Sequence, residues 1–128
     1  MNRHSFLAVA LVAPVAQGGN DCAGTPSHSE QRACLGKLAA TTAAEVALVQ
    51  SDVSKRIAHL DEEAKVKDNM LRLFRAATEQ FRRYRTTQCE FEASSAAGGN
   101  DAGDLRWQCA VRLNREYLAR LKVPVGLL

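Results

Sequence analysis

The sequence predicts an all-α protein: an antiparallel helical hairpin with a third, shorter C-terminal helix, held together by two disulfides. Three observations lead to this expectation. Apolar residues recur at three- and four-residue spacing along most of the chain, which is the period of a helix that buries one face. No segment alternates apolar and polar residues in the way a half-buried strand does. Four cysteines follow an apolar N-terminal segment in this chain of 128 residues.

The first long helix is expected to begin at Ser27 or Ser29, because either side chain is a good helix cap. Ser27 and Glu30 also have the spacing of a capping box. Residues at helical spacing then form one inward-facing stripe, which comprises Leu35, Leu38, Thr42, Val46, Val49, Val53, Ile57 and Leu60. The segment 39–47 within it is rich in Ala and Thr, so a neighbouring helix can approach closely.

A charged segment with few apolar residues, 59–69, predicts the turn between the two long helices. It contains no Gly or Pro, so one long helix with a bend is the alternative. The second helix is expected to bury a stripe made of Met70, Phe74, Ala77, Phe81, Tyr84 and Phe91.

A loop is predicted over residues 94–103, which are Gly, Ala, Ser, Asn and Asp. The third helix is expected from Asp104 to Lys122, with Asp104 as its cap and Pro124 ending it. Its inward positions are expected to be Leu105, Cys109, Leu113, Tyr117 and Leu121.

Residues 1–18 resemble a secretory signal peptide. Arg3 and His4 form a short basic region, an apolar run covers residues 6–15, and Ala16-Gln17-Gly18 fits a cleavage site. The expected mature protein is a single domain over residues 19–128, located in the periplasm or secreted. The stretch before Cys22 lacks the pattern that lipidation needs, and no later apolar run is long enough to span a membrane. Removing Arg3 lowers the net charge from +3 to +2, which gives no argument for nucleic-acid or membrane binding.

Four cysteines, Cys22, Cys34, Cys89 and Cys109, allow three disulfide connectivities. The local pairing Cys22–Cys34 and Cys89–Cys109 is favoured because each bond closes a short loop and fixes a segment against a helix. The alternative is a Cys34–Cys89 bond across the hairpin. A zinc site is not expected, because the sequence has no C-x-x-C motif.

The sequence offers no catalytic constellation, so the protein is not expected to be an enzyme or to hold a cofactor or metal. His28 and His59 have no nucleophile at a recognisable spacing, and Glu62 and Glu63 point about 100° apart on a helix. Five arginines lie within residues 72–85 and alternate with aromatic residues. The aromatic residues fall on the core stripe, so the arginines are interpreted as a solvated face and not as a nucleic-acid interface.

If the protein binds a partner, contact is expected at the end of the hairpin that carries the second pair of cysteines. Loops on rigid scaffolds often carry binding residues. Arg85, Arg106 and Trp107 flank the predicted loop, and Arg and Trp are frequent hot-spot residues. The competing interpretations are structural: Arg85 donates to helix-end carbonyls or to an acidic side chain near the disulfide, and Trp107 packs in the core beneath the loop.

The pattern as a whole resembles the LprI-like lysozyme inhibitor family. The shared features are Asp21-Cys22, Cys34, Tyr84-Arg85, Cys89, the Gly-containing loop and Cys109, which together span the expected mature chain. The chain departs from the family at Phe81, where the family has Trp, and at Thr86, where it has Asp. The terminal Thr-x-x-Arg of the family stands here as Asn114-x-x-Tyr117.

The resemblance implies an exported envelope protein that binds and blocks lysozyme or a related glycan-cleaving enzyme. The alternative is a non-catalytic structural or interaction module of the bacterial envelope without a lysozyme target. The sequence leaves the partner and the oligomeric state open.

Overall fold

The computed structural model describes residues 21–122. The predicted signal peptide, residues 1–18, and the predicted helix stop at Pro124 lie outside this range. The described chain is all-α, with three helices in the order α1 (His28–Ala58), α2 (Ala64–Ser94) and α3 (Ala102–Leu121). This confirms the predicted fold class.

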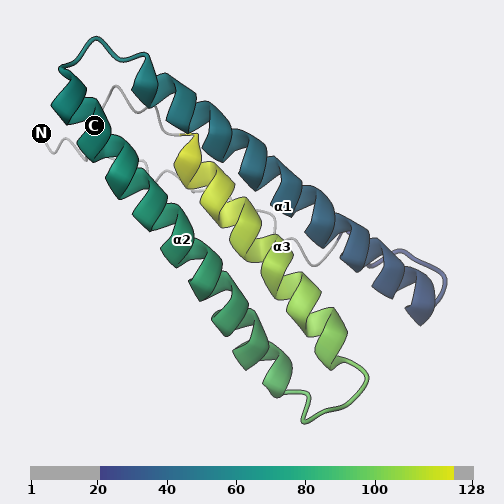
Figure 1. Cartoon of the computed structure of the whole chain (residues 1–128). Coiled ribbons are helices and arrows are strands. Elements are labelled where there is room, and N and C mark those ends of the chain that lie inside the picture. Colours follow the sequence, from purple (N-terminus) through teal and green to yellow (C-terminus); the bar gives the residue numbers. More distant parts are fainter. Residues whose placement is uncertain (1–20, 123–128) are drawn as a thin grey trace, which may run out of the picture.

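The two long helices are antiparallel, and α3 returns between them (Figure 1). Helices α1 and α2 have 31 residues each and α3 has 20. At about 1.5 Å per residue, α3 therefore covers roughly two thirds of the length of the long helices. Most contacts between helices involve α3, and α1 and α2 touch each other less. The core thus lies along α3.

Helix α1 begins where the sequence predicts. The Ser27 hydroxyl oxygen accepts a hydrogen bond from the Glu30 backbone N–H at 3.2 Å and donates one to the Glu30 carboxylate at 3.1 Å. At the other end, the His59 ring bonds the Lys55 carbonyl at 2.7 Å, and the basic Lys55 and Arg56 occupy the last turn. Positive charge is stabilising there, because the carbonyl end of the helix dipole is negative.

The turn between α1 and α2 is shorter than predicted. It covers residues 59–63, and residues 64–69 already belong to α2. The alternative of one long bent helix is wrong, because α1 ends at Ala58. This start of α2 is mostly exposed, and its Val66 is 43% exposed, so the helix extends here without burying an apolar face.

Helix α3 begins two residues before the predicted cap, at Ala102. Asp104 is not the cap: it lies in the first turn, and its carboxylate bonds His28 and Arg32 of α1 instead. The loop is accordingly residues 95–101, shorter than predicted. Its tip contains two residues with positive φ, Ala97 at 49° and Gly98 at 78°.

The core has two apolar clusters. One surrounds Val53, Ile57 and Leu121 near the α1–α2 turn. The other surrounds Cys89, Cys109 and Leu113. Stacked rings of Phe81 and Tyr117, with centroids 3.8 Å apart, connect the two clusters. The inward positions predicted for α1 and α3 are all buried or half-buried.

The predicted stripe of α2 is only partly right. Met70, Phe74 and Phe81 contact the core, but Ala77, Tyr84 and Phe91 are exposed. Tyr84 is 54% exposed and Phe91 is 70% exposed. The inward-facing residues of this part of α2 are instead Arg85 and Cys89. The polar Arg85 therefore faces the bundle where the prediction placed the aromatic Tyr84.

No helix within residues 21–122 is long and apolar enough to cross a membrane.

Candidate functional site

Both disulfides follow the local pairing. Cys22–Cys34 and Cys89–Cys109 have Cα–Cα distances of 5.9 and 5.4 Å, so the alternative Cys34–Cys89 bond is wrong. The first bond fixes the N-terminal segment to the start of α1, and a hydrogen-bonded ion pair between Asp21 and Arg115 ties the same segment to α3. The second bond joins α2 to α3 next to the 95–101 loop.

Arg85, predicted as a partner-binding residue, belongs to a polar chain that crosses the bundle. Its Nη1 donates to Asn114 Oδ1 at 2.7 Å. Asn114 Nδ2 in turn donates to Thr42 Oγ1 at 3.0 Å, and the Thr42 hydroxyl donates to the Leu38 carbonyl at 3.0 Å. Asn114 and Thr42 are only 1% and 3% exposed, so these bonds satisfy polar groups that water does not reach.

Arg85 carries its charge without a carboxylate partner among the described residues. Its guanidinium carbon lies 5.5 Å from the centroid of the Phe81 ring, in cation–π range. Partial burial, followed by repulsion from Arg82, lowers the pKa of Arg85 below its ordinary value. The guanidinium is thus a positive charge held in place by neutral groups.

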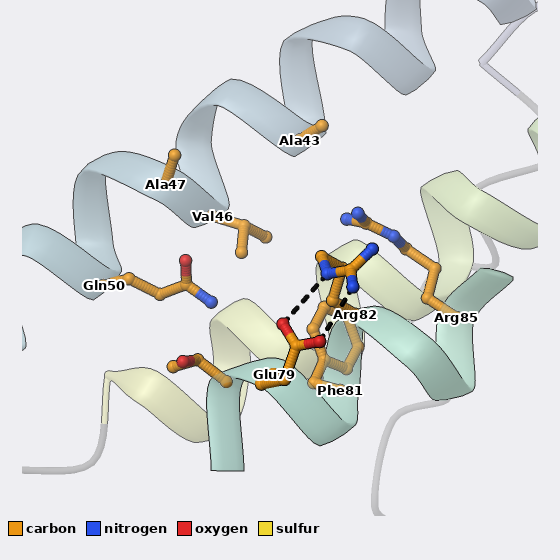
Figure 2. A pocket seen from close by; sticks show the side chains of 9 residues that line it. Ala43, Val46, Ala47, Gln50, Glu79, Phe81, Arg82 and Arg85 are labelled. Carbon is orange, nitrogen blue, oxygen red and sulfur yellow. Dashed lines mark hydrogen bonds and ion pairs between the residues drawn. The ribbon is translucent and has the colours of Figure 1, made fainter. Parts of the chain in front are cut away.

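A groove of about 240 Å³ lies beside Arg85, between α1 and α2 (Figure 2). The α1 side presents Ala43, Val46, Ala47 and Gln50, and the α2 side presents Thr78, Glu79, Phe81, Arg82 and Arg85. Hydrogen bonds from Arg82 and then Arg83 lower the pKa of Glu79 to about 2. Glu79 is therefore ionised and fully engaged by its two neighbouring arginines at neutral pH.

The loop end of the bundle is fastened by Asp104. Asp104 is only 8% exposed, and its carboxylate accepts bonds from His28 at 2.7 Å and from Arg32 at 3.0 Å. Burial alone would raise the pKa of Asp104, but the bonds from His28 and Arg32 outweigh it and hold the pKa below the ordinary value. Arg32 also donates to the Asn100 carbonyl at 2.7 Å, which ties the 95–101 loop to α1.

His28, Asp101 and Asp104 bring three possible metal-ligand atoms within 4.8 Å of one another. The Arg32 guanidinium, 3.0 Å from the Asp104 carboxylate, places a positive charge at the same point. Both oxygens of Asp104 are already bonded, to His28 and Arg32. Asp104 is therefore already paired with the Arg32 cation, which a bound metal ion would have to displace.

The other two predicted site residues face different helices. Arg106 forms a two-pronged pair with Glu90 of α2, at 2.6 and 3.1 Å. Trp107 is half-buried against α1, where a Cβ placed on Gly36 would lie 3.3 Å from the indole ring. The structure therefore does not bring Arg85, Arg106 and Trp107 together on one surface.

Sequence reasoning missed four residues that organise these contacts: Asn114, Thr42 as a polar partner, Gly36, and Asp104 as an ion-pair centre. The sequence feature that could have revealed Asn114 is the width of the inward face of the third helix. Buried residues of α3 extend beyond the predicted line to Val111, Asn114 and Leu118, because α3 packs against helices on two sides. An Asn within so wide a face is a buried polar group that needs partners.

The fold and these contacts define a class, a small three-helix protein with two disulfides and a charged groove on its surface. Comparison of this chain with family models, with curated proteins and with solved structures finds no match.

Proposed function

We propose that this chain is a non-catalytic exported protein that binds and blocks lysozyme or a related glycan-cleaving enzyme. The proposal starts from the resemblance of the Asp21-Cys22, Tyr84-Arg85 and cysteine pattern to the LprI-like family. All four cysteines are paired, which suits an oxidising compartment such as the periplasm.

The observation that carries the proposal is the fixed position of the exposed 95–101 loop. The Cys89–Cys109 bond holds the helices on either side of it, and Arg32 holds the Asn100 carbonyl between them. Residues 97–101 are nevertheless exposed at the end of the bundle. A projecting loop that is already ordered loses little conformational entropy when it enters a cleft. Glycan-cleaving enzymes present such a cleft.

A turbidity assay tests the proposal directly. Lysozymes of several types are mixed with bacterial cell walls and an excess of the purified protein, and clearing of the suspension is followed over time. We expect clearing to slow in proportion to the added protein for at least one lysozyme type. Full activity of every type at micromolar protein contradicts the proposal.

Two variants locate the contact. Arg32→Gln releases the Asn100 carbonyl and is expected to weaken inhibition, because the loop then has to be ordered on binding. Arg75→Gln is the matched control: it removes an exposed arginine from α2 and is expected to inhibit like the wild type. Equal inhibition by both variants contradicts a role for the fixed loop.

A separate observation favours the second candidate, an interaction module of the envelope without an enzyme target. Leu73, Tyr84 and Phe91 are exposed on α2, and their spacing of 11 and 7 residues places them on one line along the helix. Three large exposed apolar side chains on one face of a helix offer a surface for protein–protein contact. The double variant Tyr84→Ser/Phe91→Ser distinguishes the candidates, because it removes partner capture by an interaction module but leaves loop-based lysozyme inhibition intact.

A further inference from the structure

The groove between α1 and α2 has an unbalanced positive charge at one end. Its charged residues are Glu79, Arg82 and Arg85. Glu79 is bonded by Arg82, at 2.8 and 3.0 Å, and by Arg83 at 3.0 Å. The carboxylate of the groove is thus already shared between two arginines, while Arg85 bonds only the neutral amide of Asn114 among the described residues.

The remaining donors of Arg85 are accessible. A guanidinium has five N–H donors, and one hydrogen bond to Asn114 uses one of them. No buried side-chain nitrogen or oxygen in residues 21–122 lacks a hydrogen-bond partner. The unbonded nitrogens of the half-buried Arg85 are therefore not fully buried and have some contact with solvent. The guanidinium extends from α2 toward Ala43 of α1 (Figure 2), which is the side of the groove.

The opposite wall of the groove, on α1, determines which chemical groups the rest of a ligand can have. Ala43, Val46 and Ala47 present short aliphatic side chains, and Gln50 adds an amide farther along α1. The groove, of about 240 Å³, has room for a small organic molecule only. The space therefore suits a compact ligand that has an anionic head and a short aliphatic body.

We infer that this groove binds a monocarboxylate with a short aliphatic chain, whose carboxylate pairs with the Arg85 guanidinium and whose chain lies against Ala43, Val46 and Ala47. The planar guanidinium matches a carboxylate with two parallel hydrogen bonds. A single carboxylate pairs with Arg85, the arginine of the groove lining that has no carboxylate partner among the described residues. A phosphate group has no aliphatic part for the alanine wall. This site does not include the 95–101 loop, so the test of this inference is independent of the test of the proposed inhibition.

Titration of the ¹⁵N-labelled protein, followed by NMR, tests the inference. The probe is butyrate, and the signals are the Arg85 Nε–Hε group and the backbone amides of Ala43 and Ala47. We expect saturable shifts at millimolar butyrate and none with butanol or with sodium chloride at the same concentration. Shifts that do not saturate, or that butanol reproduces, overturn the inference.

A second probe identifies the source of the carboxylate. Glutamate blocked at both ends, as its acetyl N-methylamide, offers the same aliphatic carboxylate in the form of a protein side chain. Tighter binding of butyrate supports a free small acid as the ligand, whereas tighter binding of the blocked glutamate supports an acidic side chain of a partner. Failure of both probes to bind overturns the inference.

Two variants assign the site to Arg85 and to the groove. Arg85→Gln removes the charge and is expected to weaken butyrate binding by about tenfold or more, since a charge-assisted pair is lost. Ala47→Leu fills the groove from an exposed position and leaves the Arg85–Asn114 bond in place, so it abolishes binding even if Arg85→Gln fails to fold. Leu48→Ala, on the exposed face outside the groove, is the matched control and is expected to bind like the wild type. Wild-type affinity in both Ala47→Leu and a folded Arg85→Gln contradicts the site.

Discussion

Asn114 of α3 joins the two long helices through its single amide group, accepting from Arg85 of α2 and donating to Thr42 of α1. Every other side chain of this size and depth in the described core is apolar or a cysteine. A buried polar network stabilises one arrangement only if all members are satisfied, because any shift of one helix leaves a buried group unpaired. These bonds therefore fix how the three helices align along their axes.

The first prediction concerns this network. Asn114→Ala leaves Arg85 and Thr42 without their partner and opens a cavity, so we expect the free energy of unfolding to fall by about 3 kcal/mol. Thr42→Val keeps the shape and removes two bonds, the one that Thr42 accepts from Asn114 and the one that it donates to the Leu38 carbonyl, so we expect a loss of about 2 kcal/mol. Urea denaturation measures both values.

The double variant tests whether the two residues act together. With Asn114 already absent, Thr42→Val removes only the bond to the Leu38 carbonyl, so the combined loss should be smaller than the sum of the single losses by about 1 kcal/mol. Additive losses contradict a direct Thr42–Asn114 interaction. Thr41→Val is the matched control, since Thr41 is an exposed neighbour whose hydroxyl bonds its own helix.

The second prediction concerns acid stability. The pKa of Asp104 is lower in the folded protein than its value of 3.8 in a free chain, because His28 and Arg32 bond its ionised form. Its contribution to stability is therefore fully present above pH 3.8 and is lost as the pH falls through the folded pKa.

Asp104→Asn isolates this contribution. We expect the variant to be less stable than the wild type by about 2 kcal/mol near neutral pH, since it loses bonds to charged groups. The difference should shrink below pH 3.8 as the wild-type carboxylate becomes protonated. Thermal unfolding across pH 2 to 7 measures it, and a difference that stays constant with pH contradicts the assignment.

The sequence predicted the helices because one face of each is buried. The predicted inward-facing stripes of α1 and α3 are confirmed, because the apolar residues of each helix lie on one line. The α2 stripe failed at Tyr84 and Phe91, because hydrophobicity alone does not distinguish a core residue from an exposed aromatic one. The true inward residue next to Tyr84 is Arg85, which periodicity assigns to solvent.

The contacts of the candidate residues were harder to predict. Arg85 was expected to donate to helix-end carbonyls or to an acidic side chain near the second disulfide, but it bonds the neutral amide of Asn114, 29 residues away in the chain. Such a pairing depends on the relative alignment of α2 and α3, which sequence spacing does not give. Asp104 was predicted as a cap because Asp is common there, but tertiary ion pairs with α1 determine its role.

The third prediction concerns the order in which the disulfides are reduced. Cys34 is half-exposed, whereas Cys22, Cys89 and Cys109 are 3% exposed or less. Exchange needs a thiolate to reach a sulfur atom, so we expect Cys22–Cys34 to be reduced first under mild reductant. Alkylation followed by peptide mass mapping detects the order. Early labelling of Cys89 and Cys109 contradicts this expectation.

The last prediction concerns the contact between Gly36 and Trp107. A Cβ at residue 36 would lie 3.3 Å from two carbon atoms of the indole ring, so the ring must move for alanine to fit. Alanine is also the better helix former, by about 1 kcal/mol. In the wild-type background these effects oppose each other, and we expect Gly36→Ala to bring no gain in stability.

Removing the ring reverses the balance. Trp107→Ala should lower the free energy of unfolding by about 3 kcal/mol because an aromatic side chain packed against α1 is lost. In that background Gly36→Ala no longer meets the indole, so we expect it to raise stability by about 1 kcal/mol. Gly103→Ala, where an added Cβ meets no atom within 4 Å, is the matched control and should have the same effect in both backgrounds. An equal effect of Gly36→Ala in both backgrounds would show that Trp107 does not pack against Gly36.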